Sequence, residues 1–194
     1  MIVDATEDGQ TPLDPDEAAG LIPAWIATRG DLNVAEEENI REGQAWMRRI
    51  VGRRDVLTQD FLRELHKRMF GKVWHWAGTY RMSEKNIGVA PNAITTELKK
   101  LLDDARAWDE YKTYPLDERA ARLHHRLTWI HPFANGNGRC ARVSVDAYLT
   151  KNRGEEFTWG AHLPADEQRP QYIATIRAAD GRDYAPLLAF LRTR

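Results

Sequence analysis

The sequence predicts a mainly α-helical domain with one small β-hairpin. Apolar residues recur at helical spacing through most of the chain, which is typical of helices that bury one face. One stretch, WHWAGTYRMSEKNIGVAP, instead has β-favouring residues on both sides of a polar SEK turn. At 194 residues the chain is long enough for one domain, which we place at residues 31–194, after an N-terminal arm and short helix at residues 1–30.

The separate helices follow from their apolar stripes and from signals at their ends. The first dozen residues are polar and contain Gly9 and Pro12, so they are predicted as an arm. Thr58 is expected to cap the helix that follows it, and Pro132 to end the helix before it. The other predicted helices are residues 16–26, 33–50, 93–110 and 116–130, one that starts near 137, and residues 169–179 and 185–193, the last two separated by a DGRD turn.

Composition excludes several classes of function. A formal net charge of -1 gives no bulk attraction for nucleic acids or anionic membranes. The single cysteine, Cys140, excludes an intramolecular disulfide and agrees with a reducing compartment. The acidic N-terminus lacks the features of a signal peptide, and no window is apolar enough to span a bilayer. We therefore expect a cytoplasmic protein.

The segment HPFANGNGRCAR carries the chemistry of the chain. Gly136 and Gly138 are expected to let the backbone adopt conformations closed to other residues, so that several N–H groups converge on one point. The apolar pattern after the loop predicts a helix that starts near Asn137, with its positive end facing these amides, as in anion sites. Arg139 and Arg142 lie three residues apart, so they share a helix face and could reach successive phosphates.

This segment resembles the motif of the Fic family, HPFx(D/E)GNGRxxR. It matches every fixed position from His131 to Arg142 except Asn135, where the family usually has an acid. The resemblance implies a Fic-type helical bundle with a β-hairpin flap over the active site. It also implies transfer of a nucleotide monophosphate, commonly AMP from ATP, onto a protein hydroxyl. WAGTYR, NIGV, HHRLTWIHPF and RAADGRDYAPLLAFL extend the resemblance to the short bacterial branch catalogued as mobile mystery protein B.

The resemblance assigns roles to the motif residues. His131 is the candidate general base, because a neutral imidazole can take the proton of a serine, threonine or tyrosine hydroxyl as its bond to phosphorus forms. Arg139 is expected to bind the β-phosphate and Arg142 the γ-phosphate. The residues expected to hold nucleotide phosphates are Gly136, Asn137, Gly138, Arg139 and Arg142.

The departure from the family pattern falls at the metal position. Mg²⁺ prefers oxygen ligands, and Asn135 offers a carbonyl oxygen without the charge of an acid, so we expect a weak Mg²⁺ site, with Mn²⁺ as a second candidate. The alternative is that Asn135 only caps the following helix. His124 and His125 have no acid at the spacing of an HExxH zinc site and are expected to pack and hydrogen-bond beside the active site.

Two further regions gain roles from the resemblance. The hairpin would pair with the backbone of a target segment in the manner of a β-strand, which aligns a target without reading its side chains. Its predicted docking residues are Tyr80, Asn86, Ile87, Gly88 and Val89. Many family members also carry an inhibitory helix with the pattern (S/T)xxxE(G/N), whose glutamate pairs with the second motif arginine. Glu38-Asn39 and Glu42-Gly43 each match its end and lack its leading hydroxyl, and a plain surface role stays open for both glutamates.

The leading hypothesis is a protein adenylyltransferase that uses ATP and Mg²⁺. The alternatives are transfer of UMP, phosphate or phosphocholine, and a pseudoenzyme that holds a nucleotide or peptide without turnover. Asn135 favours the pseudoenzyme, whereas His131 and the two arginines oppose it. The expected partners are ATP, a target protein that presents serine, threonine or tyrosine, and an antitoxin-like protein if the chain acts as a toxin. The oligomeric state is left open.

Overall fold

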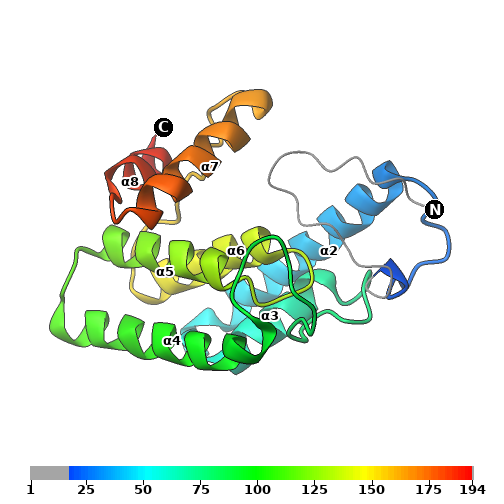
Figure 1. Cartoon of the computed structure of the whole chain (residues 1–194), viewed down its shortest axis with the longest axis horizontal. Coiled ribbons are helices and arrows are strands. Elements are labelled where there is room, and N and C mark those ends of the chain that lie inside the picture. The colour runs from blue at the N-terminus through cyan, green and yellow to red at the C-terminus, as the bar shows by residue number, and fades with distance from the viewer. Residues whose placement is uncertain (1–17, 194) are drawn as a thin grey trace.

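The protein is mainly helical over residues 18–193, the part of the chain that this computed structural model describes (Figure 1). Within these residues there is no β-strand, and one isolated antiparallel bridge joins Leu21 to Trp74. No helix in this range is both long and apolar enough to cross a membrane. The helices are α2 (Arg29–Ile50), α3 (Gln59–Phe70), α4 (Ile94–Tyr111), α5 (Leu116–Ile130), α6 (Asn137–Lys151), α7 (Ala165–Asp180) and α8 (Ala185–Arg192), with 3-10 turns at Val51–Arg53 and Pro91–Ala93.

Most predicted helices are confirmed, with shifted starts where capping decides the boundary. Helix α2 begins four residues before the predicted start, because Thr28 and Asp31 form a capping box: the Asp31 N–H donates to Thr28 Oγ1 at 3.1 Å, and the Thr28 N–H to Asp31 Oδ2 at 2.9 Å. Thr58 caps α3 as predicted, since its hydroxyl accepts from the Phe61 N–H at 3.1 Å. Helix α7 begins at Ala165, directly after Pro164.

The predicted helix at residues 16–26 is wrong from residue 19 onward. Residues 19–26 form turns and extended backbone, and the arm before them lies outside the described residues. The Ile22 N–H donates to Val73 O at 2.8 Å, and the His75 N–H to Gly20 O at 2.8 Å. These bonds to a distant segment replace the bonds that a helix would have made locally, and Pro23 has no N–H to contribute to one.

Helices α5 and α6 form the centre of the fold. In Figure 1 they lie between α4 on one side and the pair α7 and α8 on the other, while α2 packs along α3. Ile130 of α5 and Val145 of α6 are fully buried, and so are Leu65 of α3, Leu98 of α4 and Leu187 of α8. The loop between α5 and α6 holds the first half of the HPFANGNGRCAR segment, residues 131–136, and the second half begins α6. Both ends of this loop are thus fixed by well-buried helices.

The predicted β-hairpin at residues 80–89 is wrong, because this segment is an irregular loop. The loop is organised by Arg81, whose buried guanidinium donates to the carbonyls of Ser83, at 2.8 Å, and Val89. The Arg81 side chain therefore hydrogen-bonds backbone carbonyls that would pair with backbone N–H groups of the opposite strand in a hairpin. The same residue ties the loop to the segment after α5, since its backbone N–H donates to Pro132 O at 2.9 Å.

Candidate active site

The turn from α5 into α6 depends on two residues with left-handed backbone. His131, at the C-terminal end of α5, has φ 53°, and Gly136, the N-cap of α6, has φ 74°. A Cβ at Gly136 would lie 2.6 Å from Cζ of Phe70, so conformation and space both require glycine there. The same expectation for Gly138 is wrong: it lies in the first turn of α6 with helical backbone, and its missing side chain leaves open space beside the amides.

Helix α6 begins at Asn137, as predicted, and presents its first amides at the loop. The first helical bond runs from Cys140 N to Gly136 O at 2.9 Å, so the N–H groups of residues 137–139 precede it and sit at the positive end of the helix. This arrangement suits the binding of an anion such as a phosphate.

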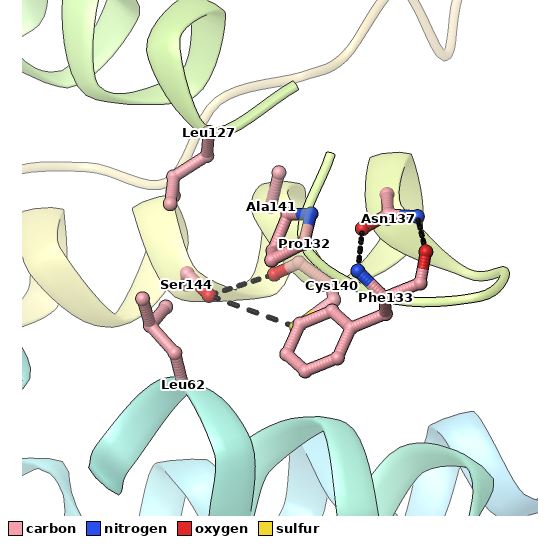
Figure 2. Close-up of a pocket in the computed structure, with 8 residues that line it drawn as sticks. All are labelled: Leu62, Leu127, Pro132, Phe133, Asn137, Cys140, Ala141 and Ser144. Carbon is pink, nitrogen blue, oxygen red and sulfur yellow. Dashed lines mark hydrogen bonds between the residues drawn. The ribbon is translucent and has the colours of Figure 1, made fainter. Parts of the chain in front are cut away.

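The side chain of Asn137 differs from its predicted role as a phosphate ligand. Figure 2 shows it joined to the backbone of Phe133: its Oδ1 accepts from the Phe133 N–H at 2.8 Å, and its Nδ2 donates to Phe133 O at 2.8 Å. Because the amide is buried and engaged at both ends, it fixes the shape of the loop. The contribution of Asn137 to an anion site is therefore its backbone N–H.

His131 has the chemical form of a general base. Its Nδ1 lies 3.3 Å from Thr128 O, and because a carbonyl can only accept, this nitrogen carries the hydrogen and the lone pair lies on Nε2. Burial, together with nearby Arg81 and Lys85, lowers the pKa of His131 to about 4, against the opposing effect of the Thr128 carbonyl. The ring is thus neutral at physiological pH and able to accept a proton.

Two residues that sequence reasoning missed hold the loop in place. Arg81 donates from Nε to the carbonyl of His131 at 2.7 Å. His66 of α3 is fully buried, lies with its ring 3.8 Å from that of Phe133, and bridges Asn135 O at 3.0 Å to the Gly78 N–H at 3.0 Å. A histidine within the apolar stripe of α3 was the signal for such a role, because a buried imidazole needs polar partners.

The two motif arginines point to different helices. Nη1 of Arg139 lies 2.6 Å from Oε2 of Glu36 in α2, and Oε1 of the same buried carboxylate accepts from the Trp74 indole at 2.7 Å. Arg142 instead lies over the ring of Tyr172 in α7, 4.9 Å from its centroid. Each guanidinium thus has its own anchor, on α2 for Arg139 and on α7 for Arg142.

The carboxylate that reaches a motif arginine is therefore neither of the two predicted glutamates. Glu38 is exposed, and Glu42 pairs with Lys72 at 2.6 Å. Glu36 shares the inward face of α2 with Asn39, whose buried side chain donates to Arg68 O at 3.0 Å. Glu36 and Asn39 are three residues apart, a spacing that places both on one face of a helix and that was visible in the sequence. The partner of Glu36, Arg139 of α6, becomes apparent only in the folded chain.

The metal position is met by a single amide oxygen. Asn135 Oδ1 accepts from the Gly136 N–H at 2.5 Å. No group of three or more histidine, cysteine, aspartate or glutamate side chains within residues 18–193 could hold a metal ion. This donor set fits a Mg²⁺ ion held mainly by nucleotide phosphates.

His124 and His125 pack and hydrogen-bond as expected. His124 Nε2 lies 2.8 Å from the hydroxyl of Tyr172. His125 Nε2 lies 2.8 Å from Asp180 Oδ1, and its Nδ1 lies 3.1 Å from the hydroxyl of Tyr184. Both histidines thus link α5 to the helices at the C-terminal end of the chain.

A small cavity lies behind the loop, between α3, α5 and α6 (Figure 2). Its volume of about 10 Å³ matches about one water molecule. Cys140, one of its lining residues, is buried, which raises the pKa of its thiol to about 12 and keeps it protonated. A nucleotide is too large to enter this cavity.

Comparison with known proteins agrees with this geometry. The model of the Fic/DOC family matches residues 56–149. Protein adenylyltransferase fic-1 of Caenorhabditis elegans is 29% identical over 145 residues, which cover 71% of this chain and 27% of that protein. Protein adenylyltransferase Fic of Nematostella vectensis is 30% identical over 147 residues, which cover 73% of this chain and 33% of that protein. The chain thus spans about a quarter to a third of the length of these relatives.

Solved structures share the fold. The Fic-1 fragment of C. elegans aligns with a TM-score of 0.65 at 23% identity, over 89% of this chain and 51% of that one. The BepC protein of Bartonella tribocorum, solved with bound AMPPNP, aligns with a TM-score of 0.70 at 17% identity, over 92% of this chain and 96% of that one. Residues 56–149 thus match a Fic/DOC family domain, and the HPFANGNGRCAR motif forms the loop between α5 and α6 and the first turns of α6.

Proposed function

We propose that this protein transfers AMP from ATP to a hydroxyl of a target protein. The observation that carries the proposal is the neutral imidazole of His131, with its lone pair on Nε2, at the start of a loop that leads into the amides and arginines of α6. Two kinds of comparison support it: the curated relatives are named protein adenylyltransferases, and the related BepC fold was solved with a bound ATP analogue.

In this mechanism the target hydroxyl attacks the α-phosphorus of ATP. A bond forms between the hydroxyl oxygen and phosphorus, the bond from the α-phosphorus to the bridging oxygen breaks, and pyrophosphate leaves while Nε2 of His131 takes the hydroxyl proton. The amides of residues 137–139 stabilise the charge that grows on the phosphate oxygens. Arg139 would bind the β-phosphate and Arg142 the γ-phosphate.

Asn135 is the residue that would hold Mg²⁺, through Oδ1 and together with the phosphates. The ion would supply positive charge beside the leaving pyrophosphate. Since the loop has an amide in place of an acid, most of the affinity for the metal would come from the nucleotide. Mn²⁺ is the second candidate.

The loop at residues 80–89 is the proposed docking site for the target. Gly88 touches the catalytic residue, because a Cβ there would lie 2.7 Å from Cβ of His131, and the neighbouring Ile87 and Met82 are exposed. Tyr80 faces inward, with its hydroxyl donating to Gln59 Oε1 at 3.1 Å. The proposed contacts with target backbone therefore fall to Asn86, Ile87, Gly88 and Val89.

Several finer assignments belong to the same proposal. The peptide segments that resemble mobile mystery protein B support membership of that bacterial branch. A cytoplasmic location and an antitoxin-like partner would agree with such a role. A pseudoenzyme is the second candidate function, and the observation that favours it is the ion pair of Arg139 with Glu36, which occupies a phosphate-binding side chain.

Incubation with ATP labelled at the α- or the γ-phosphate, with and without Mg²⁺, tests the proposal. Label from the α position on protein is expected for AMP transfer, whereas label from the γ position alone would mean phosphorylation. If no label from either position appears on protein, the pseudoenzyme is favoured. His131→Ala should lower transfer by about two to four orders of magnitude while nucleotide binding persists. His75→Ala, an exposed histidine outside the motif, is the matched control and should retain wild-type transfer.

A further inference from the structure

Arg142 rests on a group of aromatic side chains from three other parts of the chain. Its guanidinium carbon lies 4.9 Å from the ring centroid of Tyr172 in α7 and 5.8 Å from that of Trp159, in the segment between α6 and α7. His124 of α5 packs on both rings, with its centroid 4.7 Å from Trp159 and 5.8 Å from Tyr172. We call Trp159, Tyr172 and His124 the arginine seat.

Polar contacts hold each ring of the seat in a defined position. The indole N–H of Trp159 donates to Asp146 Oδ1 at 3.0 Å, one helical turn after Arg142 on α6. The backbone carbonyl of Trp159 accepts from Gln168 Nε2 at 3.0 Å, and its own φ is 54°, in the left-handed region. The hydroxyl of Tyr172 lies 2.8 Å from His124 Nε2. A bulky residue in this backbone region is strained, so the surrounding contacts must determine its position.

Arg142 makes cation–π contacts with the uncharged Trp159 and Tyr172 rings of the arginine seat. Burial, together with nearby Arg142 and His125, lowers the pKa of His124 to about 3, so the imidazole is uncharged. Burial also raises the pKa of the Tyr172 hydroxyl, although Arg142 opposes the rise. Such a contact fixes the plane of a guanidinium. Nε of Arg142 is buried and has no hydrogen-bond partner within residues 18–193, which is a cost to folding that a role in binding would explain.

We propose that Trp159, Tyr172 and His124 are positioning residues that hold the Arg142 guanidinium toward the terminal phosphate of a nucleoside triphosphate. This inference rests on the proposed function of Arg142. It assigns part of the nucleotide site to residues 159 and 172, which lie outside residues 56–149, the range matched by the family model. The seat acts only through Arg142, so its effect is confined to nucleotides that carry the phosphate this arginine binds.

Titration calorimetry with AMPPNP and with AMP, both with Mg²⁺, tests this proposal on the full chain. Tyr172→Leu removes the ring and should weaken AMPPNP binding about tenfold, the size expected for loss of a partly buried cation–π contact, and leave AMP binding within about twofold. Tyr172→Phe keeps the ring but loses the bond to His124, and a smaller loss, about threefold, is expected.

Tyr184→Leu is the matched control. Tyr184 also hydrogen-bonds a histidine of α5, His125, and carries an arginine, Arg122, 4.2 Å above its ring, but it has no contact with the motif loop among the described interactions. The control should leave AMPPNP binding unchanged. Circular dichroism verifies that each variant is folded, and Tyr172→Phe, which keeps the packing volume, carries the test if Tyr172→Leu does not fold.

A double-mutant cycle separates positioning from general destabilisation. If the seat acts through Arg142, Arg142→Ala with Tyr172→Leu should bind AMPPNP no more weakly than Arg142→Ala alone. The proposal fails if the losses of AMPPNP affinity in the two single variants multiply in the double variant. It also fails if Tyr172→Leu weakens the binding of AMP and AMPPNP equally. Absence of AMPPNP binding by the wild type would overturn the proposed function itself, and the seat with it.

Discussion

Replacement of Glu36 by glutamine should strengthen the binding of ATP. The Glu36 carboxylate pairs with Nη1 of Arg139 at 2.6 Å and accepts from the Trp74 indole at 2.7 Å. Glutamine keeps an acceptor oxygen for Trp74 and removes the charge that holds Arg139. The arginine then no longer has to leave an ion pair when a phosphate arrives, and the negative charge that would repel this phosphate is gone.

The burial of the two side chains sets the size of the effect. The Glu36 side chain is 9% exposed and that of Arg139 is 40% exposed. Hydrogen bonds to charged groups contribute about 1.5–3 kcal/mol, whereas ion pairs in full solvent contribute at most about 1 kcal/mol. A pair with one buried and one half-exposed partner falls between these values. A tenfold change in Kd corresponds to about 1.4 kcal/mol, so release of Arg139 from this pair should lower the Kd for ATP by about 5- to 20-fold.

Glu38→Gln and Glu42→Gln are matched controls for this prediction. Both glutamates lie on the same helix and are exposed, so removal of their charge should change the Kd by less than about twofold. Titration with AMPPNP measures binding, and self-modification with α-labelled ATP measures transfer. An unchanged or weaker affinity in Glu36→Gln would refute the reasoning. A gain in Glu38→Gln or Glu42→Gln alone would instead assign inhibition to one of the glutamates predicted from the family pattern.

Three further predictions follow from the loop and from α6. Since burial lowers the pKa of His131 to about 4, kcat/KM for transfer should agree within about twofold at pH 5.5 and pH 7.5, and a tenfold loss at pH 5.5 would mean an ordinary histidine. Asn135→Asp should need less Mg²⁺ than the wild type for half-maximal transfer at saturating ATP, and superimposable curves would exclude a metal contact. Burial raises the pKa of Asp146 to about 7, against the opposing Trp159 N–H, from an ordinary value of 3.8, so the folded state holds this proton more tightly and the gain in stability is lost as the pH rises through 7. Urea unfolding should therefore show wild-type stability falling by roughly 2–3 kcal/mol more than that of Asp146→Asn between pH 5 and pH 8, and equal falls would contradict it.

The sequence predicts the parts of this fold whose signals are local. The ends of α5 and α6 follow from Pro132 and Gly136, which act on their own neighbours, and the stripes on both helices are continuous. The loop at residues 80–89 was mispredicted because its β-favouring composition is local, whereas the bonds of Arg81 to His131 and Pro132 join segments fifty residues apart. Local pattern does not reveal which carbonyl a distant guanidinium will occupy.

The candidate site also contains features that the sequence predicts and features that it does not predict. The motif identified the position of His131 and of the first amides of α6, because those depend on the loop alone. It could not show that the Asn137 side chain is engaged by Phe133, or that Glu36 would be the acid facing Arg139. Both facts depend on how the loop packs against other helices.

The anchors of the two arginines have opposite consequences for nucleotide binding. Arg139 is held by the charge of Glu36, a partner that competes directly with a phosphate for the same N–H groups. Arg142 is held by the ring of Tyr172, an uncharged partner that does not compete with a phosphate by its charge. Loss of the first anchor should therefore strengthen AMPPNP binding, and loss of the second should weaken it. Because the anchors lie on different helices and act on different arginines, the double variant Glu36→Gln with Tyr172→Leu should bind with the product of the two single effects, close to the wild-type affinity.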